Sequence, residues 1–407
     1  MVTQGTGPRD RGLVHAVARP EPSRLPSLTG LRFVAALLVF ATHVLWNTQL
    51  VPGDAGKELR HAFSLSGAYG VGFFFILSGF VLTWTARPDD TAHSFWRRRL
   101  VKIGPTHVVT FASAAVFVLS TNRPTRTVDW LASLTLQQAW FPSMQTSTAV
   151  NGVSWSLSCE FFFYLIFPAL LPALRRIREE RLWAAVAAVA ALIVGAFLTA
   201  TFLVPDQPRL NVFFLSGSVS FSQVWFVYFF PPVRALEFVL GILLARIVVS
   251  GRWPAIGLAP AFAWAVAGYV IALYEPYLAG TAGMASVWTA PLIAAAAVAD
   301  RRGDPSVFRR PTMVFLGELS FAFYMIHWLV VMTAAQVMEP TRTFPPVTGA
   351  LLLLALLAVA LVCSLFLYRC LETPLVRRFG RHRPDARTTR ASDPDAASRA
   401  DGHRVPE

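Results

Sequence analysis

Apolar segments of about 20 residues recur along almost the whole chain, and they constrain its fold more than any other feature. A helix that crosses the hydrocarbon core of a bilayer needs about 20 predominantly apolar residues. Ten segments meet this requirement, at 27–48, 66–86, 100–121, 155–174, 183–204, 233–250, 256–274, 283–300, 315–337 and 347–369. The sequence therefore predicts an all-α, polytopic membrane protein with about ten transmembrane helices in a lipid bilayer.

The composition supports this prediction. Hydrophobic residues make up 55% of the chain and charged residues only 14%, whereas a soluble domain carries about 25% charged residues. A single large core does not explain so low a charged fraction, because the surface of a soluble protein must still face water. Many segments of this chain must therefore never face water.

The distribution of Lys and Arg orients the predicted helices. With the N-terminus in the cytoplasm, 28 of the 36 basic residues fall in inner segments and 7, including Arg234, fall in outer loops. Cytoplasmic loops of membrane proteins carry such an excess of positive charge. We therefore expect both termini to be cytoplasmic. The net charge of +13 reflects these loops, and no nucleic-acid partner is expected.

The remaining segments divide the chain. Residues 1–26 predict a disordered basic cytoplasmic tail, 27–378 the membrane domain, and 379–407 a second disordered cytoplasmic tail. Phe213 to Ser222 and Trp225 to Phe230 are candidates for an extra short or re-entrant helix, and Trp130 to Trp140 for an interfacial segment. Cys159, Cys363 and Cys370 have no metal-binding spacing. We expect reduced thiols and no metal site.

Two polar residues in the first span, Arg32 and His43, are candidates for a functional site. Charged groups inside a membrane are costly and commonly functional. The two residues are 11 positions apart, so they share one helix face and are separated by about 16 Å along its axis. Each also has a simpler explanation: Arg32 as a side chain that snorkels to lipid phosphate, and His43 as a structural hydrogen-bond donor.

Glu160 opens the fourth span, within the segment Trp155-Ser156-Leu157-Ser158-Cys159-Glu160. Entering from the outer side, it is expected at a depth similar to that of His43. A carboxylate beside an imidazole fixes the tautomer of the ring and raises its basicity, as general-base catalysis requires. The alternative is an acidic residue that the dipole at the start of the helix favours.

Arg99 and Lys102 begin the third span and share a helix face, because they are three residues apart. Such a cationic pair at the cytoplasmic end suits phosphate groups, although it also fits plain cytoplasmic loop charge. Ser320, Tyr324 and His327 recur at intervals of four and three residues and predict one polar helix face. For each of these three residues alone, packing or hydrogen bonding is the simpler role.

In their order along the chain, several segments resemble the motifs of the acyltransferase 3 family. The resemblance rests on Leu28 to Arg32 with His43, Phe73 to Phe80, Arg99 to Pro105, Trp155 to Glu160, Arg234 to Gly241, Leu319 to His327, and Tyr368 to Pro374. It covers roughly residues 27–378. One departure is Lys102, where the family has a second Arg. Lys102 keeps the positive charge but lacks the bidentate fork of a guanidinium.

The resemblance implies a ten-helix membrane O-acyltransferase that uses acyl-CoA, here expected to be acetyl-CoA, as donor co-substrate. No tightly bound cofactor is implied, and His43 matches the essential catalytic residue. Acceptors in the family include surface polysaccharides and the sugars of secreted antibiotics. We expect a compact member without the soluble SGNH-type domain, acting on a macrolide-type antibiotic or a surface polysaccharide in the bacterial plasma membrane.

Our hypothesis assigns the residues as follows. Arg32, Arg99 and Lys102 bind the CoA phosphates, His43 takes the proton of the acceptor hydroxyl, and Glu160 orients the imidazole. Ser156, Tyr324 and His327 are assigned to substrate binding. Direct transfer and an acyl-His intermediate both remain open. The alternative functions are a proton-coupled transporter of anionic or glycosidic solutes and an inactive protein of the same fold.

Overall fold

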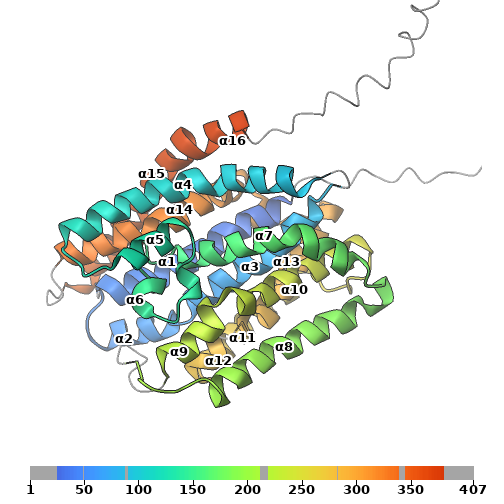
Figure 1. Cartoon of the computed structure of the whole chain (residues 1–407), viewed down its shortest axis with the longest axis horizontal. Coiled ribbons are helices and arrows are strands. Elements are labelled where there is room, and N and C mark those ends of the chain that lie inside the picture. The colour runs from blue at the N-terminus through green and yellow to red at the C-terminus, as the bar shows by residue number, and fades with distance from the viewer. Residues whose placement is uncertain are drawn as a thin grey trace, which may run out of the picture.

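The computed structural model describes residues 25–48, 50–87, 90–210, 219–281, 283–338 and 344–379. Long helices lie side by side in a bundle, with most of them running along the longest axis of the molecule (Figure 1). In this part of the chain the only β-type pairing is an isolated bridge between Arg209 and Ser220. The all-α prediction is confirmed.

The helices have the following bounds. The long helices are α1 (Pro26–Thr48), α3 (Ser66–Trp84), α4 (Ala92–Ser120), α7 (Trp155–Arg175), α8 (Leu182–Phe202), α10 (Pro231–Val249), α11 (Leu258–Ala272), α13 (Ala285–Arg302), α14 (Pro311–Val337) and α15 (Pro346–Leu367). The short helices are α2 (Gly53–Ala62), α5 (Thr127–Leu134), α6 (Met144–Ser147), α9 (Phe221–Val224), α12 (Tyr277–Thr281) and α16 (Thr373–Phe379). Single turns include η1 (Gln138–Trp140), η4 (Trp225–Phe229), η5 (Val307–Arg309) and η6 (Tyr368–Glu372).

Each of the ten predicted spans coincides with one of these long helices. Among the described residues, eight helical segments are long and apolar enough to cross a membrane. The other two are α10, which carries Arg234, Glu237 and Arg246, and α11, an apolar helix of 15 residues. The chain is therefore a multi-pass membrane protein.

Local signals in the sequence place several helix ends. Pro231, Pro311 and Pro346 stand at the first turns of α10, α14 and α15. Proline is favoured there because the first amides of a helix have no partner within it. At the other end, α13 stops at Gly303, which adopts a left-handed conformation with φ of 79°. Glycine takes this conformation without the steric cost that a Cβ atom imposes.

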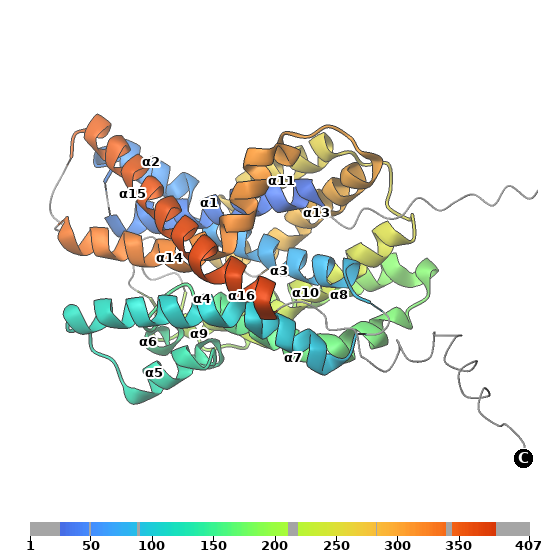
Figure 2. The ribbon, with the colours of Figure 1, turned by 90° about the horizontal axis from the view of Figure 1, so that it is seen from above.

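The centre of the bundle is built around α1 and α3. Helix α1 packs most extensively against α14 and α3, and α3 against α10; Figure 2 shows α1, α3 and α14 lying close together when the bundle is seen from above. At the α3–α10 crossing, a Cβ atom at Gly79 would lie 2.0 Å from the carbonyl oxygen of Phe238. A Cβ atom at Gly241 would lie 1.9 Å from that of Ile76. These glycines let the two backbones touch, as small residues do between membrane helices.

The short helices α2, α5, α6 and α9 gather at one end of the bundle, on the left of Figure 1. They belong to the connections between α1 and α3, α4 and α7, and α8 and α10. These are the connections that the charge distribution assigns to the outer side. The predicted interfacial segment Trp130 to Trp140 is found here, in α5 and η1.

Asp129, in α5, links segments at this end of the bundle through hydrogen bonds with Arg126 and Thr146. Its buried carboxylate accepts hydrogen bonds of 2.9–3.2 Å from the backbone and side chain of Arg126 and from the hydroxyl of Thr146. Burial alone would raise the pKa of Asp129, but these hydrogen bonds and the charge of Arg126 lower it.

We expect Asp129→Asn to lower the stability of the detergent-purified protein by about 1–3 kcal/mol, because it removes charged hydrogen bonds that a buried carboxylate accepts. A carboxylate with a lowered folded-state pKa contributes stability above its unfolded pKa and loses it as the pH falls. The difference in Tm between wild type and variant should therefore shrink below about pH 4. Asp54→Asn, at an exposed ion pair with Lys57, serves as the control. An equal effect of both substitutions would contradict the prediction.

One expectation about the loops is wrong. Arg234, assigned to an outer loop, lies inside α10 with a side chain that is 2% exposed. Helix α10 begins at Pro231, before the predicted span, and Arg234 forms an ion pair of 2.9 Å with Glu237 one turn along. Most of the predicted tails, together with residues 213–218 of the candidate extra helix, fall outside the described residues. The described remainder of that candidate forms α9 and η4.

Candidate active site

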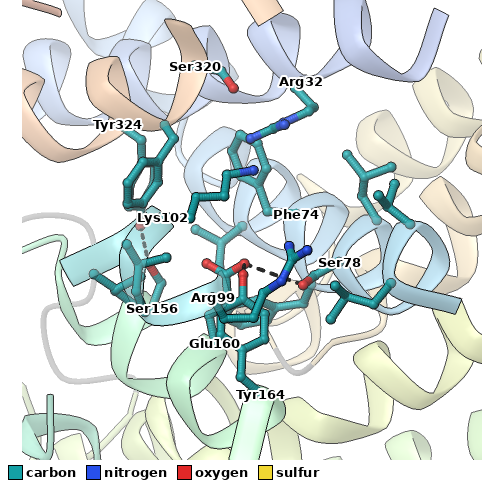
Figure 3. Close-up of a pocket in the computed structure, with 18 of the residues that line it drawn as sticks. Arg32, Phe74, Ser78, Arg99, Lys102, Ser156, Glu160, Tyr164, Ser320 and Tyr324 are labelled. Atoms are coloured by element: carbon teal, nitrogen blue, oxygen red, sulfur yellow. Dashed lines mark hydrogen bonds between the residues drawn. The ribbon is translucent and has the colours of Figure 1, made fainter. Parts of the chain in front are cut away.

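A cavity of about 890 Å³, measured out to its mouth, opens between α1, α3, α4, α7 and α14. Figure 3 shows the side chains that point into it: Arg32, Phe74, Ser78, Arg99, Lys102, Ser156, Glu160, Tyr164, Ser320 and Tyr324. Six of the eight predicted site residues are among them. The other two, His43 and His327, do not line the cavity.

Arg32, Arg99 and Lys102 come from two helices, α1 and α4, and converge on this cavity (Figure 3). None of the three forms an ion pair or a side-chain hydrogen bond with another described residue. The guanidinium of Arg99 lies 5.6 Å from the ring centre of Phe95 and 6.0 Å from that of Tyr164. Cations held in a cavity without an ionic partner suit an anionic ligand.

Two carboxylates act on these cations from a greater distance. The charge of Lys102 interacts with those of Glu160 and Glu372, as well as with Arg32 and Arg99. Glu372 lies in η6 near the C-terminal end of the described chain and is 8% exposed. It brings the predicted closing motif, Tyr368 to Pro374, within electrostatic reach of the first and third predicted spans. We call the cavity that Arg32, Arg99 and Lys102 line the cation-lined cavity.

Glu160 lines the cation-lined cavity and forms no hydrogen bond with the side chain of His43. Its carboxylate accepts hydrogen bonds from the hydroxyl of Ser78, at 3.3 Å, and from that of Tyr164 (Figure 3). The hydrogen-bond partner of the His43 side chain is His327 instead. The expected contact between Glu160 and the imidazole of His43 is therefore wrong.

The reason is that α7 begins inside the protein. Residues 149–159 are all buried, so the chain enters the bundle before the helix starts at Trp155. Asn151 donates a hydrogen bond of 3.0 Å to the carbonyl oxygen of Met325. A Cβ atom at Gly152 would lie 2.6 Å from the ring of Trp328. This buried entrance shifts Glu160 along the bundle, past the depth of His43.

His43 pairs with His327 across the seam between α1 and α14. Nδ1 of His43 lies 3.0 Å from Nε2 of His327, and the two rings are stacked with centres 5.2 Å apart. Trp328 meets His43 edge to face at 5.0 Å. His327 is fully buried, whereas His43 is partly exposed.

The contacts of His327 fix the tautomers of the neutral pair. Nδ1 of His327 lies 3.2 Å from the carbonyl oxygen of Phe323. Because a carbonyl oxygen only accepts, Nδ1 of His327 carries the hydrogen, and its Nε2 is left as an acceptor. That Nε2 accepts the Nδ1–H of His43. Nε2 of His43 is then unprotonated, which is the state that a general base or a nucleophile needs.

Tyr324 connects the histidine pair to the cation-lined cavity. Its hydroxyl shares a hydrogen bond of 2.7 Å with that of Ser156, and both side chains line the cavity. Its ring lies 5.7 Å from the ring of His327. Ser320, Tyr324 and His327 thus share one face of α14, as their spacing predicts. The polar groups run from Arg32 to His43 along the contact between α1 and α14.

Sequence reasoning missed Ser78, Tyr164 and Trp328. Ser78 lies within the Phe73 to Phe80 segment, and Tyr164 follows Glu160 by four residues, so both carried a usable signal. Trp328 carried none, since it adjoins His327 in sequence but contacts His43 in space. The buried pair Arg234–Glu237 supports the cavity from behind, because Arg234 lies over the ring of Phe75, a lining residue, at 5.1 Å.

Comparison with known proteins identifies the family of the chain. The acyltransferase domain of the acyltransferase 3 family matches residues 25–369. The acyltransferase MdmB of Streptomyces mycarofaciens is 39% identical over 377 residues, which cover 90% of this chain and 95% of that protein. The peptidoglycan O-acetyltransferase OatA of Listeria monocytogenes is 24% identical over 392 residues, covering 86% of this chain and 56% of OatA. No solved structure matches the chain significantly.

The family match spans the helices that form the cavity and the histidine pair, from α1 to the start of η6. In addition, MdmB is similar to the chain over nearly the full length of MdmB. The chain therefore belongs to the acyltransferase 3 family and is a membrane O-acyltransferase.

Proposed function

We propose that the enzyme transfers an acyl group from acyl-CoA, with acetyl-CoA as the expected donor, to a hydroxyl of a glycan or glycosylated small molecule. One observation carries the proposal. Three cations without an ionic partner line a cavity that reaches, through Tyr324, the buried partner of His43. The acyl donor is a co-substrate, and no tightly bound cofactor is required.

The cation-lined cavity suits the donor. CoA carries phosphate groups at one end and its thioester at the end of a long, uncharged pantetheine arm. Arg32 and Arg99 present guanidinium groups that match phosphate oxygens in pairs, and Lys102 adds a point charge. The separation of about 16 Å between Arg32 and His43 along α1 is comparable with the length of an extended pantetheine arm. Glu160 offsets part of the positive charge at this end.

In the proposed reaction, Nε2 of His43 removes the proton of the acceptor hydroxyl as its oxygen attacks the acyl carbon. The carbon–sulfur bond breaks, the ester bond forms, and the proton passes from His43 to the leaving thiolate, which gives free CoA. The Nδ1–H of His43 continues to donate its hydrogen bond to Nε2 of His327, which stabilises the imidazolium that forms. A route through acyl-His43 uses the same unprotonated nitrogen and remains open.

We assign the acceptor to glycans or glycosylated small molecules, either a macrolide-type antibiotic or a surface polysaccharide, and the enzyme to the bacterial plasma membrane. OatA, by its name, acts on peptidoglycan. Ser156 and Tyr324, at the end of the cavity nearest the histidine pair, are proposed to contact the substrates. The alternative of a proton-coupled transporter gains no support from the matched family or from these relatives.

The donor assignment predicts a specific kinetic effect. Arg99→Gln should raise KM for acetyl-CoA by about 10–100-fold, because a charged hydrogen bond to phosphate is lost. It should change KM for S-acetyl-N-acetylcysteamine, a thioester without phosphates, by less than about twofold. Thiol release by the purified enzyme measures both. Arg97→Gln, at an exposed site on the same helix outside the cavity, is the matched control.

Equal effects of Arg99→Gln on both donors would show that Arg99 shapes the cavity without binding phosphate. Absence of thiol release from any acyl-CoA, in the presence of a panel of glycosylated acceptors, would contradict the proposed function itself.

A further inference from the structure

A second hollow lies at the opposite end of α1 from Arg32. It has a volume of about 920 Å³ measured out to its mouth, and its wall includes Trp46, Lys57, Arg60, His61, Glu275 and Tyr277. These residues come from the end of α1, from α2, from the segment that joins α11 to α12, and from the first residue of α12. We call it the outer pocket. It lies among the connections that the charge distribution places on the outer side of the membrane.

The outer pocket begins one helical turn from His43. Trp46 follows His43 by three residues on α1, so the two side chains lie on adjoining parts of one helix face, about 4.5 Å apart along the axis. The cation-lined cavity approaches the histidine pair from the other direction, through Tyr324. His43 therefore lies between two hollows, one at each end of α1.

The chemistry of the outer pocket differs from that of the cation-lined cavity. Its wall combines the aromatic rings of Trp46 and Tyr277 with cationic side chains, an imidazole and the carboxylate of Glu275. The positive charge of Lys57 is offset by an ion pair with Asp54 at 2.9 Å. Charges of both signs do not select for an anion such as a lipid phosphate.

Aromatic rings beside mixed donors and acceptors suit a polyhydroxylated ligand. The apolar face of a sugar ring packs on an aromatic ring, while its hydroxyls both donate and accept hydrogen bonds. Glu275 would also accept a hydrogen bond from the ammonium group of an amino sugar.

We propose that the outer pocket binds the sugar of the acceptor and delivers its hydroxyl to His43 from the outer side of the membrane. This inference rests on the proposed function and extends it: the donor reaches His43 from the cytoplasmic end and the acceptor from the outer end. The transfer itself is the one described above, with the hydroxyl proton passing through His43 to the leaving thiolate.

Kinetics of the purified full-length enzyme test the assignment. The donor is acetyl-CoA, and the acceptors are erythromycin, tylosin and maltotriose. For an acceptor that the wild type acetylates, Trp46→Ala should raise the acceptor KM about tenfold or more, and Glu275→Gln about threefold or more. Both should change KM for acetyl-CoA by less than about twofold. Trp46→Phe, which keeps an aromatic ring, should recover most of the affinity for the acceptor.

Glu58→Gln is the matched control, because Glu58 is exposed on α2 beside Lys57 and does not line the outer pocket. The proposal would be overturned if Trp46→Ala and Glu275→Gln had the same acceptor KM as the control. It would also be overturned if the two variants raised KM for the acceptor and KM for acetyl-CoA by the same factor. No acetylation of any acceptor by wild type would instead contradict the proposed function, so the two failures are distinguishable.

Labelling in intact cells tests the side of the membrane independently of turnover. A Trp46→Cys variant should react with a membrane-impermeant maleimide, while the wild type, whose three cysteines remain, sets the background. Labelling above background only after permeabilisation, or no labelling above background in either state, would overturn the outer location of the pocket.

Discussion

Replacing His43 by alanine is expected to reduce acyl transfer about 100- to 10,000-fold, with little change in KM for acyl-CoA. The reason is chemical. General-base catalysis by a positioned imidazole contributes about 10²–10⁴-fold. Nε2 of His43 is unprotonated in the neutral pair and, unlike Nε2 of His327, accepts no hydrogen bond within it. The cations that we propose to bind the donor are untouched by the substitution. The measurement is single-turnover formation of the acyl ester together with release of free thiol.

The matched control is His107→Gln. His107 is also a buried histidine of a predicted span, but its Nε2 lies 3.1 Å from the carbonyl oxygen of Leu134 and it lies outside both hollows. A His43→Ala variant that binds acyl-CoA and still transfers acyl groups at the rate of this control would exclude His43 as base and as nucleophile.

The second large effect is expected at His327. His327→Leu should lower kcat about 100-fold, because the Nδ1–H of His43 loses its acceptor and the imidazolium loses its stabilising partner. His327→Gln places an amide near the position of Nε2, and its oxygen can accept the same hydrogen. This variant should therefore recover at least about one-tenth of the wild-type kcat. The readouts are kcat, the two KM values and the pH dependence of kcat.

A purely structural role for His327 predicts a different pattern. Both variants would then lose activity in proportion to their loss of folded protein, and the pH dependence of kcat would stay that of the wild type. Equal kcat values for His327→Leu and His327→Gln, in samples of equal Tm, would contradict the assignment of His327 as the residue that positions His43.

The sequence predicted the members of the site better than their partners. Arg32, Arg99, Lys102 and Glu160 line one cavity, as expected for charged residues in predicted spans. The predicted contact between Glu160 and His43 is wrong, because the prediction takes the start of the helix at Trp155 as the point where the chain enters the membrane. The chain enters the bundle before α7 begins, and the buried Asn151 and Gly152 that hold it there carry no periodic signal.

The placement of Arg234 failed for a related reason. A charged residue at the edge of an apolar run was assigned to a loop, since an unpaired charge inside a membrane is costly. In the structure Glu237, one helical turn away, supplies the opposite charge, and the hydroxyl of Ser286 donates a hydrogen bond to Glu237. A hydropathy scale counts each charged residue separately, so it does not register that the Arg234–Glu237 pair is neutral as a whole.

The class of the protein follows from local properties of the chain: it is an all-α membrane protein, and its ten predicted apolar segments coincide with ten helices. Helix length and apolarity are local properties, and a bilayer accepts few other structures. Which polar groups meet depends instead on how the helices pack. His43 and His327 are separated by 284 positions in the chain and meet only because α1 packs against α14. A hydrogen bond of 3.0 Å between helices depends on their relative rotation and depth, and neither is encoded by local periodicity.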